Sequence, residues 1–150
     1  MNSLQDSDSL IIKALRGKGY KATPQRIAIG KFVLQNHTHP TAQRIYCEVK
    51  KVYPTVSLAT IYNTIQILKE AGLVHELNLD KDQARFDPNM MPHAHMFCLQ
   101  CKSIYDCSDP VISEIVDRMS NEADFSAGEW NFDIFGICSN CRREKSKQQS

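Results

Sequence analysis

Two pairs of cysteines, each separated by two residues, constrain this chain more than any other feature of its sequence. The pairs are Cys98 with Cys101 and Cys138 with Cys141, and 36 residues lie between them. A Cys-x-x-Cys turn directs two sulfur atoms to one side, so two such turns supply the four corners of a tetrahedral zinc site. Because a closed four-thiolate site leaves no open coordination position, we expect a structural zinc ion that ties the start of this half of the chain to its end.

The alternative interpretation is two unrelated redox or buried pairs. A redox Cys-x-x-Cys usually opens a helix after a strand in a βαβ unit, and the pattern here predicts that neither pair does so. The remaining cysteines are Cys47 and Cys107, and we expect Cys47, in a predicted helix, to be a small buried residue.

The location of the protein bears on how its cysteines are interpreted. The N-terminus lacks a basic segment followed by an apolar core, and no window approaches a membrane-spanning stretch. We therefore expect a cytoplasmic protein without membrane contact, in which paired cysteines favour metal binding over disulfides.

Charge is distributed unevenly along the 150 residues. Residues 1–88 contain 12 Lys and Arg against 8 Asp and Glu, whereas residues 89–150 contain 6 against 9. A basic first half joined to an acidic, cysteine-rich second half is typical of a nucleic-acid-binding module coupled to a second function. With 42% hydrophobic and 23% charged residues, the composition is that of a globular protein.

Four helices and a β-hairpin are predicted in the first half. The first helix is predicted to begin near Asp8 and to end at Gly17, and the second to begin at the cap Thr23 with Pro24 at its first position. The third is predicted to begin at Thr41 and to end at Tyr53, and the fourth to begin at Ser57 and to end at Gly72. The fourth helix has an apolar face formed by Leu58, Ile61, Ile65 and Leu68. Alternating segments at 73–78 and 83–87 flank a turn. Helices followed by such a hairpin predict a winged helix.

The second half has a mixed α/β pattern. Strands are predicted at 93–97, 103–107 and 130–137, and a helix begins after Ser108 or Asp109 with Pro110 at its first position. The apolar stripe of this helix is Val111, Ile112, Ile115, Val116 and Met119. The polar tail from residue 142 is expected to be frayed. We expect domains at 1–88 and 93–150, joined by a hinge at 88–92.

A second group of metal-binding side chains surrounds the first cysteine pair. His93 and His95 point to one side of a strand, and Asp106 lies on the returning strand. Asp87 and His39 are further candidates, and a mixture of imidazole and carboxylate suits Fe(II), Mn(II) or higher-coordinate zinc. An His-x-His pair is also common as a surface feature, and an Asp at a turn often caps a backbone. Spacing alone leaves these alternatives open.

Six motifs carry a resemblance to a known family: TPQR (23–26), HPTAQRIY (39–46), VSLATIYNTIQILKEAGLV (56–74), RFD (85–87), HAHMFCLQC (93–101) and CSNC (138–141). On these motifs the chain resembles the ferric uptake regulator family over most of its length. The resemblance implies a dimeric repressor with an N-terminal winged helix-turn-helix, a C-terminal α/β dimerisation domain and a structural zinc on four cysteines. It also implies a regulatory Fe2+ or Mn2+ between the domains, bound by His39, Asp87, His93, His95 and Asp106.

The implied ligands suggest a mechanism. A metal bound by residues of both halves would clamp the hinge, fix the spacing of two recognition helices, and link metal affinity to DNA affinity. A two-fold symmetric dimer predicts a palindromic operator in double-stranded DNA.

The fourth helix is the expected reader of DNA bases. Its outward arc would hold Ala59, Thr60, Tyr62, Asn63 and Gln66, while Arg26 would contact phosphates. Asn and Gln can bond adenine edges, and Ala, Thr and Tyr can touch thymine methyl groups, so an A/T-rich operator is expected. An ordinary solvated helix face is the alternative, weakened by how few charges the arc carries.

Asp87 and Asp106 bear on the branch of the family. Iron-uptake repressors tend to have Glu at these positions, whereas peroxide-sensing repressors resemble this chain with Asp at both. In that branch Fe(II) reacts with peroxide, and a ligand histidine, here His39 or His93, is oxidised and DNA is released. The alternative is an iron-uptake or other metal-uptake regulator without peroxide sensing.

Two other classes of protein are possible. A zinc enzyme could use His93 and His95 with an acid, but the chain has no HExxH helix and no HxE before a PCxxC. A zinc-ribbon interaction module would not need the basic first half. We therefore expect a regulator and no enzyme.

Overall fold

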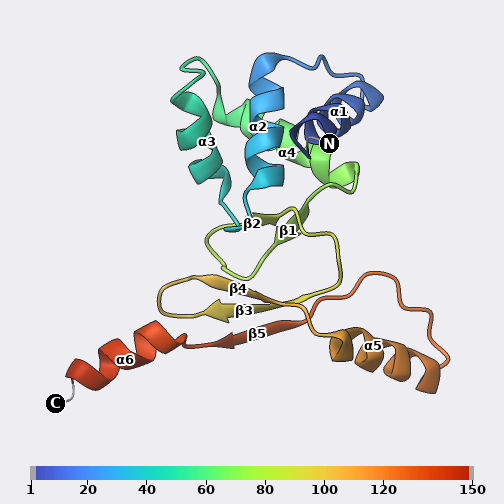
Figure 1. Cartoon of the computed structure of the whole chain (residues 1–150), viewed down its shortest axis with the longest axis vertical. Helices are drawn as coiled ribbons and strands as arrows, with labels where there is room; N and C mark the ends of the chain where they lie inside the picture. Colours follow the sequence, from blue (N-terminus) through green and yellow to red (C-terminus); the bar gives the residue numbers. More distant parts are fainter. Residues whose placement is uncertain (1–2, 149–150) are drawn as a thin grey trace. The chain divides into compact units, whose positions relative to one another are not determined.

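The computed structural model describes residues 3–148, and the chain divides between Met90 and Met91 into two compact units. Unit 1, before this point, contains α1 (Ser3–Gly17), α2 (Pro24–Gln35), α3 (Ala42–Lys50), α4 (Leu58–Glu70), β1 (His75–Leu77) and β2 (Arg85–Asp87). Unit 2 contains β3 (Ala94–Cys98), β4 (Ile104–Cys107), α5 (Pro110–Glu122), β5 (Asp133–Gly136) and α6 (Ser139–Gln148). Figure 1 labels these elements.

Three helices of unit 1 begin at the predicted caps. Thr23 accepts a hydrogen bond from the backbone N–H of Arg26, and Thr41 accepts one from Arg44. Ser57 caps α4 in the same way. Each cap satisfies a backbone donor that the first turn of a helix leaves unpaired. The predicted helix starts are therefore confirmed at α2, α3 and α4.

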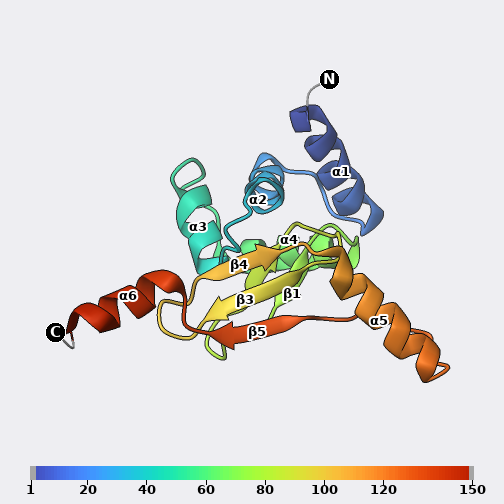
Figure 2. The ribbon, with the colours of Figure 1, turned by 60° about the horizontal axis from the view of Figure 1, so that its bottom comes forward.

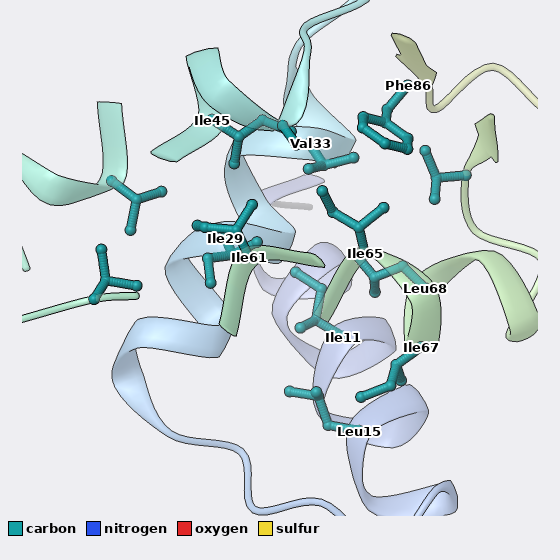
Figure 3. Packing of buried hydrophobic residues seen from close by; sticks show 14 residues of the cluster. Ile11, Leu15, Ile29, Val33, Ile45, Ile61, Ile65, Ile67, Leu68 and Phe86 are labelled. Carbon is teal, nitrogen blue, oxygen red and sulfur yellow. The ribbon is translucent and has the colours of Figure 1, made fainter. Parts of the chain in front are cut away.

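The core of unit 1 gathers apolar side chains from all four helices and the hairpin (Figure 3). Fully buried members are Ile11, Leu15, Ile29, Val33, Ile45, Ile61 and Leu68. Burial of each such side chain contributes about 1.5–3 kcal/mol relative to its exposure. Since α4 supplies several of these residues, its opposite face is held outward by the core.

A hairpin completes unit 1. Gly72 has a φ of +71°, which suits glycine and ends α4 as predicted. The antiparallel strands β1 and β2 then pair His75 with Asp87. Four helices with this wing confirm the predicted winged helix.

A three-stranded sheet in the order β4-β3-β5 forms the centre of unit 2. Its central strand β3 runs antiparallel to β4 and parallel to β5. The two helices leave the sheet at opposite ends, α5 after β4 and α6 close to the end of β5 (Figures 1 and 2). Of the α5 stripe only Ile112 is buried, whereas Val111 and Met119 are exposed. The chain alone therefore leaves an apolar face on α5 uncovered.

Several local predictions were wrong. The first helix begins at Ser3, before Asp8, with Asp6 in its first turn, where a negative charge is favourable. Leu58 is 37% exposed, because the buried face of α4 begins at Ile61. The polar tail is helical through Gln148.

Cys47 is exposed on α3, contrary to the expectation of a buried residue. The buried face of this helix is formed by Ala42, Ile45 and Val49.

Among residues 3–148, no helix combines the length and the apolar character that a membrane crossing requires.

Candidate metal centres

The four predicted zinc ligands meet at one end of the unit 2 sheet. Because β3 and β5 are parallel, with Cys98 opposite Gly136, both cysteine turns follow strands that end at the same edge. Cys98 Sγ lies 3.9 Å from Cys141 Sγ, and Cys101 Sγ lies 3.8 Å from Cys138 Sγ. All four sulfurs lie within 4.8 Å of one another.

This spacing fits a zinc ion. With zinc–sulfur bonds of about 2.3 Å, the edge of a tetrahedral site is about 3.8 Å. The two measured sulfur–sulfur distances match that edge, and the cysteines are free thiols. The residues present therefore suit a closed, structural zinc site.

Local hydrogen bonds act on these thiols in opposite directions. Backbone N–H groups of Cys101 and Cys138 donate to the Cys98 sulfur and lower the pKa of this thiol to about 6. Burial raises the pKa of the Cys141 thiol to about 12. Zinc binds thiolates, so its binding would displace the protons that remain on the cluster.

One argument against a redox pair was wrong. Cys138 and Cys141 do lie at the start of a helix that follows a strand, because α6 begins at Ser139. The four-sulfur cluster now decides in favour of zinc, since a redox pair does not need the other two cysteines within 4.8 Å.

Unit 1 contains one pair of candidate regulatory ligands. His39 Nε2 lies 3.6 Å from Asp87 Oδ2, and both side chains are buried. The backbone N–H of Asn89 donates to the other carboxylate oxygen of Asp87 at 2.9 Å, which orients this carboxylate. Two further bonds join the segment at residue 39 to β2: Arg85 Nη1 donates to the His39 carbonyl, and Phe86 N donates to the Pro40 carbonyl, each at 3.1 Å.

The backbone at His39 is also unusual. Its φ of 54° lies in the left-handed region, which few residues other than glycine adopt. Such conformations persist where surrounding contacts enforce them, and they concentrate at functional sites. The hydrogen bonds to β2 supply that enforcement.

Unit 2 contains the other three candidates. Nε2 of His93 and Nε2 of His95 each lie 3.7 Å from Asp106 Oδ1. His93 Nδ1 lies 2.7 Å from the carbonyl oxygen of Met91. Two imidazoles and one carboxylate form the donor set typical of non-haem Fe(II) sites. His93 directly precedes β3, His95 lies on β3 and Asp106 lies on β4, so this part of the sheet brings together the three ligands predicted for this half.

The residues predicted to read DNA bases all lie on α4, but some of them form hydrogen bonds within the protein. Ala59, Tyr62 and Gln66 are exposed on α4. Thr60 bonds the Ser57 hydroxyl at 2.9 Å, and Gln66 donates to Glu70 at 3.1 Å. A contact from Gln66 to a base therefore requires it to leave Glu70.

Tyr20 was missed in the sequence. Its hydroxyl accepts a hydrogen bond from Asn63 Nδ2 at 3.3 Å, and the Arg26 guanidinium lies 5.1 Å from its ring centroid. The structure thereby brings Asn63 of α4 and Arg26 of α2 to one tyrosine. No local pattern announces this, because the contact joins residues 43 apart in sequence.

Asp133 was also missed. Its carboxylate lies 3.3 Å from Nδ1 of His95. The alternation of residues 130–137 predicts that Asp133 lies on a strand. The register of β5 against β3 cannot be inferred from that alternation.

A winged-helix unit joined to an α/β unit, with a thiolate cluster and His/Asp groups, defines a winged-helix metalloregulator. The chain belongs to the ferric uptake regulator family, whose model matches residues 17–135. It is 38% identical over 141 residues to the peroxide-responsive repressor PerR of Staphylococcus saprophyticus, an alignment covering 94% of this chain and 93% of that protein.

Solved structures agree with this assignment. The Campylobacter jejuni peroxide stress regulator is 30% identical with a TM-score of 0.70, and the match covers 94% of this chain and 100% of that one. The Helicobacter pylori ferric uptake regulator shares the fold with a TM-score of 0.84 at 18% identity, covering 94% of this chain and 95% of that one.

These comparisons confirm the predicted family and fold class. Members of the family are transcriptional regulators, so the prediction of no enzyme is confirmed and the zinc-enzyme alternative is set aside.

Proposed function

We propose that the protein is a homodimeric, metal-dependent transcriptional repressor that senses peroxide. The observation that carries this proposal is the His/Asp chemistry of the two units: His39 with Asp87 in unit 1, and His93 and His95 with Asp106 in unit 2. Its 38%-identical relative in S. saprophyticus is a peroxide-responsive repressor, which supports the same assignment here.

The two halves have separate tasks in this proposal. Residues 1–88 bind DNA, residues 88–92 form a hinge, and residues 93–150 dimerise around the structural zinc. The exposed apolar residues of α5 favour a second copy as the cover for unit 2. The protein acts in the cytoplasm in this proposal, where cysteines stay reduced and available to zinc.

All five His/Asp ligands hold one regulatory ion in the proposed state. His93, His95 and Asp106 would hold the Fe(II) or Mn(II) ion from unit 2, and His39 and Asp87 would supply the matching pair of ligands from unit 1. An ion bound by both units restrains the hinge at residues 88–92 and so favours one spacing of the α4 helices in the dimer. Metal and DNA then raise each other's affinity by the same factor.

DNA is read by α4 in the major groove. Asn63 bonds base edges, and Gln66 does the same once it is released from Glu70. Tyr62, Ala59 and Thr60 contact thymine methyl groups. Arg26 contacts a phosphate beside this helix. The two-fold axis of the dimer makes the operator palindromic, and the mainly uncharged arc makes it A/T-rich.

Peroxide sensing follows from the same ligands. Fe(II) held by these residues would supply the activation of peroxide. His39 or His93 then gains one oxygen atom at its ring while peroxide is reduced to water. The oxidised ring binds metal less well, so the hinge is released and DNA dissociates.

The decisive experiment compares operator binding by the Fe(II) and Mn(II) forms before and after peroxide. The probe is a duplex selected from a random library by the Mn(II) form. Loss of binding only in the iron form, with one added oxygen on His39 or His93, is the expected result. Retained binding by the iron form would favour the alternative, an iron- or manganese-uptake regulator without peroxide sensing.

A further inference from the structure

Three side chains form a row across the unit 2 sheet. The central strand β3 places His95 opposite Asp106 of β4 and opposite Asp133 of β5. Residues directly opposite on neighbouring strands point to the same face of a sheet. Asp106 Oδ1 lies 3.7 Å from Nε2 of His95, and Asp133 Oδ1 lies 3.3 Å from Nδ1. The histidine ring thus has a carboxylate on each of its two nitrogens.

The two ring nitrogens point in different directions, so each can interact with a different partner. A neutral imidazole carries one N–H, and an ionised carboxylate only accepts hydrogen bonds. The Nδ1–H group can donate a hydrogen bond to Asp133, which leaves the Nε2 lone pair on the side of Asp106. Asp133 lies at the Nδ1 side of the ring, whereas Nε2 and Asp106 would hold an ion from the other side.

We propose that Asp133 is a positioning residue of the regulatory metal centre. It accepts the Nδ1–H of His95 and holds the ring in the tautomer and orientation in which Nε2 binds the ion. This inference rests on the proposed function and adds a residue outside the five ligands. Partners of this kind orient ligand histidines in metal sites generally and raise their basicity.

His93 supports this interpretation independently. Its Nδ1 lies 2.7 Å from the carbonyl oxygen of Met91, and its Nε2 also faces Asp106. Both unit 2 histidines therefore have an acceptor on Nδ1 and the same carboxylate near Nε2. The acceptor of His93 is backbone and cannot be removed by substitution, whereas the acceptor of His95 is a side chain.

Asp133 is suited to substitution because its side chain is 26% exposed and lies outside the unit 1 core. Asp133→Ala removes the acceptor. Asp133→Asn replaces the carboxylate with an amide that can donate to Nδ1, which would stabilise the tautomer with the proton on Nε2. Glu129→Gln is the matched control, because Glu129 is exposed, precedes β5 and loses the same negative charge.

The first measurement reads the tautomer of His95 in zinc-replete protein without a regulatory ion. Long-range nitrogen–proton NMR spectra of histidine-labelled protein distinguish Nδ1–H from Nε2–H in a ring that carries one proton. We expect Nδ1–H for His95 in the wild-type protein and the Glu129→Gln variant. We expect a mixture, or mainly Nε2–H, in the two Asp133 variants.

The second measurement is Mn(II) affinity by competition with a chelating dye. Both Asp133 variants should bind Mn(II) about 10–100-fold more weakly with unchanged zinc content, while Glu129→Gln binds as the wild type does. An Nε2–H tautomer in the wild type, or wild-type Mn(II) affinity in Asp133→Ala, would overturn the inference about Asp133 but not the proposed function. Equal losses in Glu129→Gln and Asp133→Asn would also overturn it, because charge would then be the cause. Failure of the wild-type protein to bind Mn(II) would instead overturn the proposed function.

Discussion

Gly30 of α2 packs directly against Ile11 of α1. A Cβ atom at this position would lie 2.9 Å from both Cγ1 and Cγ2 of Ile11 and 3.0 Å from its Cδ1. Ile11 is fully buried and β-branched, so it has one favoured rotamer in a helix and little room to turn. Gly30→Ala therefore forces the two helices apart or strains Ile11.

Two effects of Gly30→Ala oppose each other. Alanine stabilises a helix interior by about 0.5–1 kcal/mol relative to glycine. Overpacking a core by one methyl group costs about 1–3 kcal/mol. We expect the cost to win, with a net loss of about 1 kcal/mol in the free energy of unfolding.

Urea unfolding of the full-length, zinc-replete protein, followed by circular dichroism, measures this loss. Gly17→Ala is the control, because a Cβ there has nothing within 4 Å. That variant should keep or gain stability, because the added methyl group meets no neighbouring atom within 4 Å. A Gly30→Ala protein as stable as Gly17→Ala would refute the packing argument.

Three further predictions concern zinc, the α4 cap and base reading. Cys138→Ser removes one corner of the thiol cluster and should abolish zinc binding and the dimer, measured by metal analysis and gel filtration; a fully zinc-loaded, dimeric variant would show that the zinc is not structural. Ser57→Ala deprives the Thr60 N–H of its acceptor and should cost about 1 kcal/mol in urea unfolding; an unchanged midpoint would contradict that role. Tyr20→Phe removes the hydroxyl that Asn63 donates to and should reduce discrimination between the selected and a scrambled duplex by roughly fivefold, the equivalent of one hydrogen bond of about 1 kcal/mol. Equal discrimination by the variant and the wild type would exclude this contact from base reading.

The sequence predicted what depends on near neighbours in the chain. Thr23, Thr41 and Ser57 announce helix starts because their acceptors lie three residues from the donors they satisfy. The period of the apolar residues in α4 similarly identifies most of its buried face. Leu58 is the exception, since a first-turn side chain can extend beyond the core.

What depends on distant contacts was not predictable from spacing. The paired ligands His39 and Asp87 come from a loop and a strand end that meet only when β2 bonds the segment after His39. The helix α6 has a strongly polar sequence without an apolar stripe, and only the burial of Cys141 in the thiol cluster anchors its first turn. Residue type and position named the five candidate ligands, and the resemblance to a family was needed to group them into one site.

Asp133 shows the same limit at finer scale. Its partner is set by the parallel register of β5 on β3, which no local signal encodes.

The central claim is that one ion couples the His/Asp ligands of both units to DNA binding. Its most direct test measures the affinity for the selected duplex with and without Mn(II), and the affinity for Mn(II) with and without that duplex. The account predicts the same factor in both directions, and loss of that factor in both His39→Ala and His95→Ala, while zinc content stays unchanged. DNA affinity that does not depend on Mn(II), or coupling that survives in His39→Ala, would contradict it.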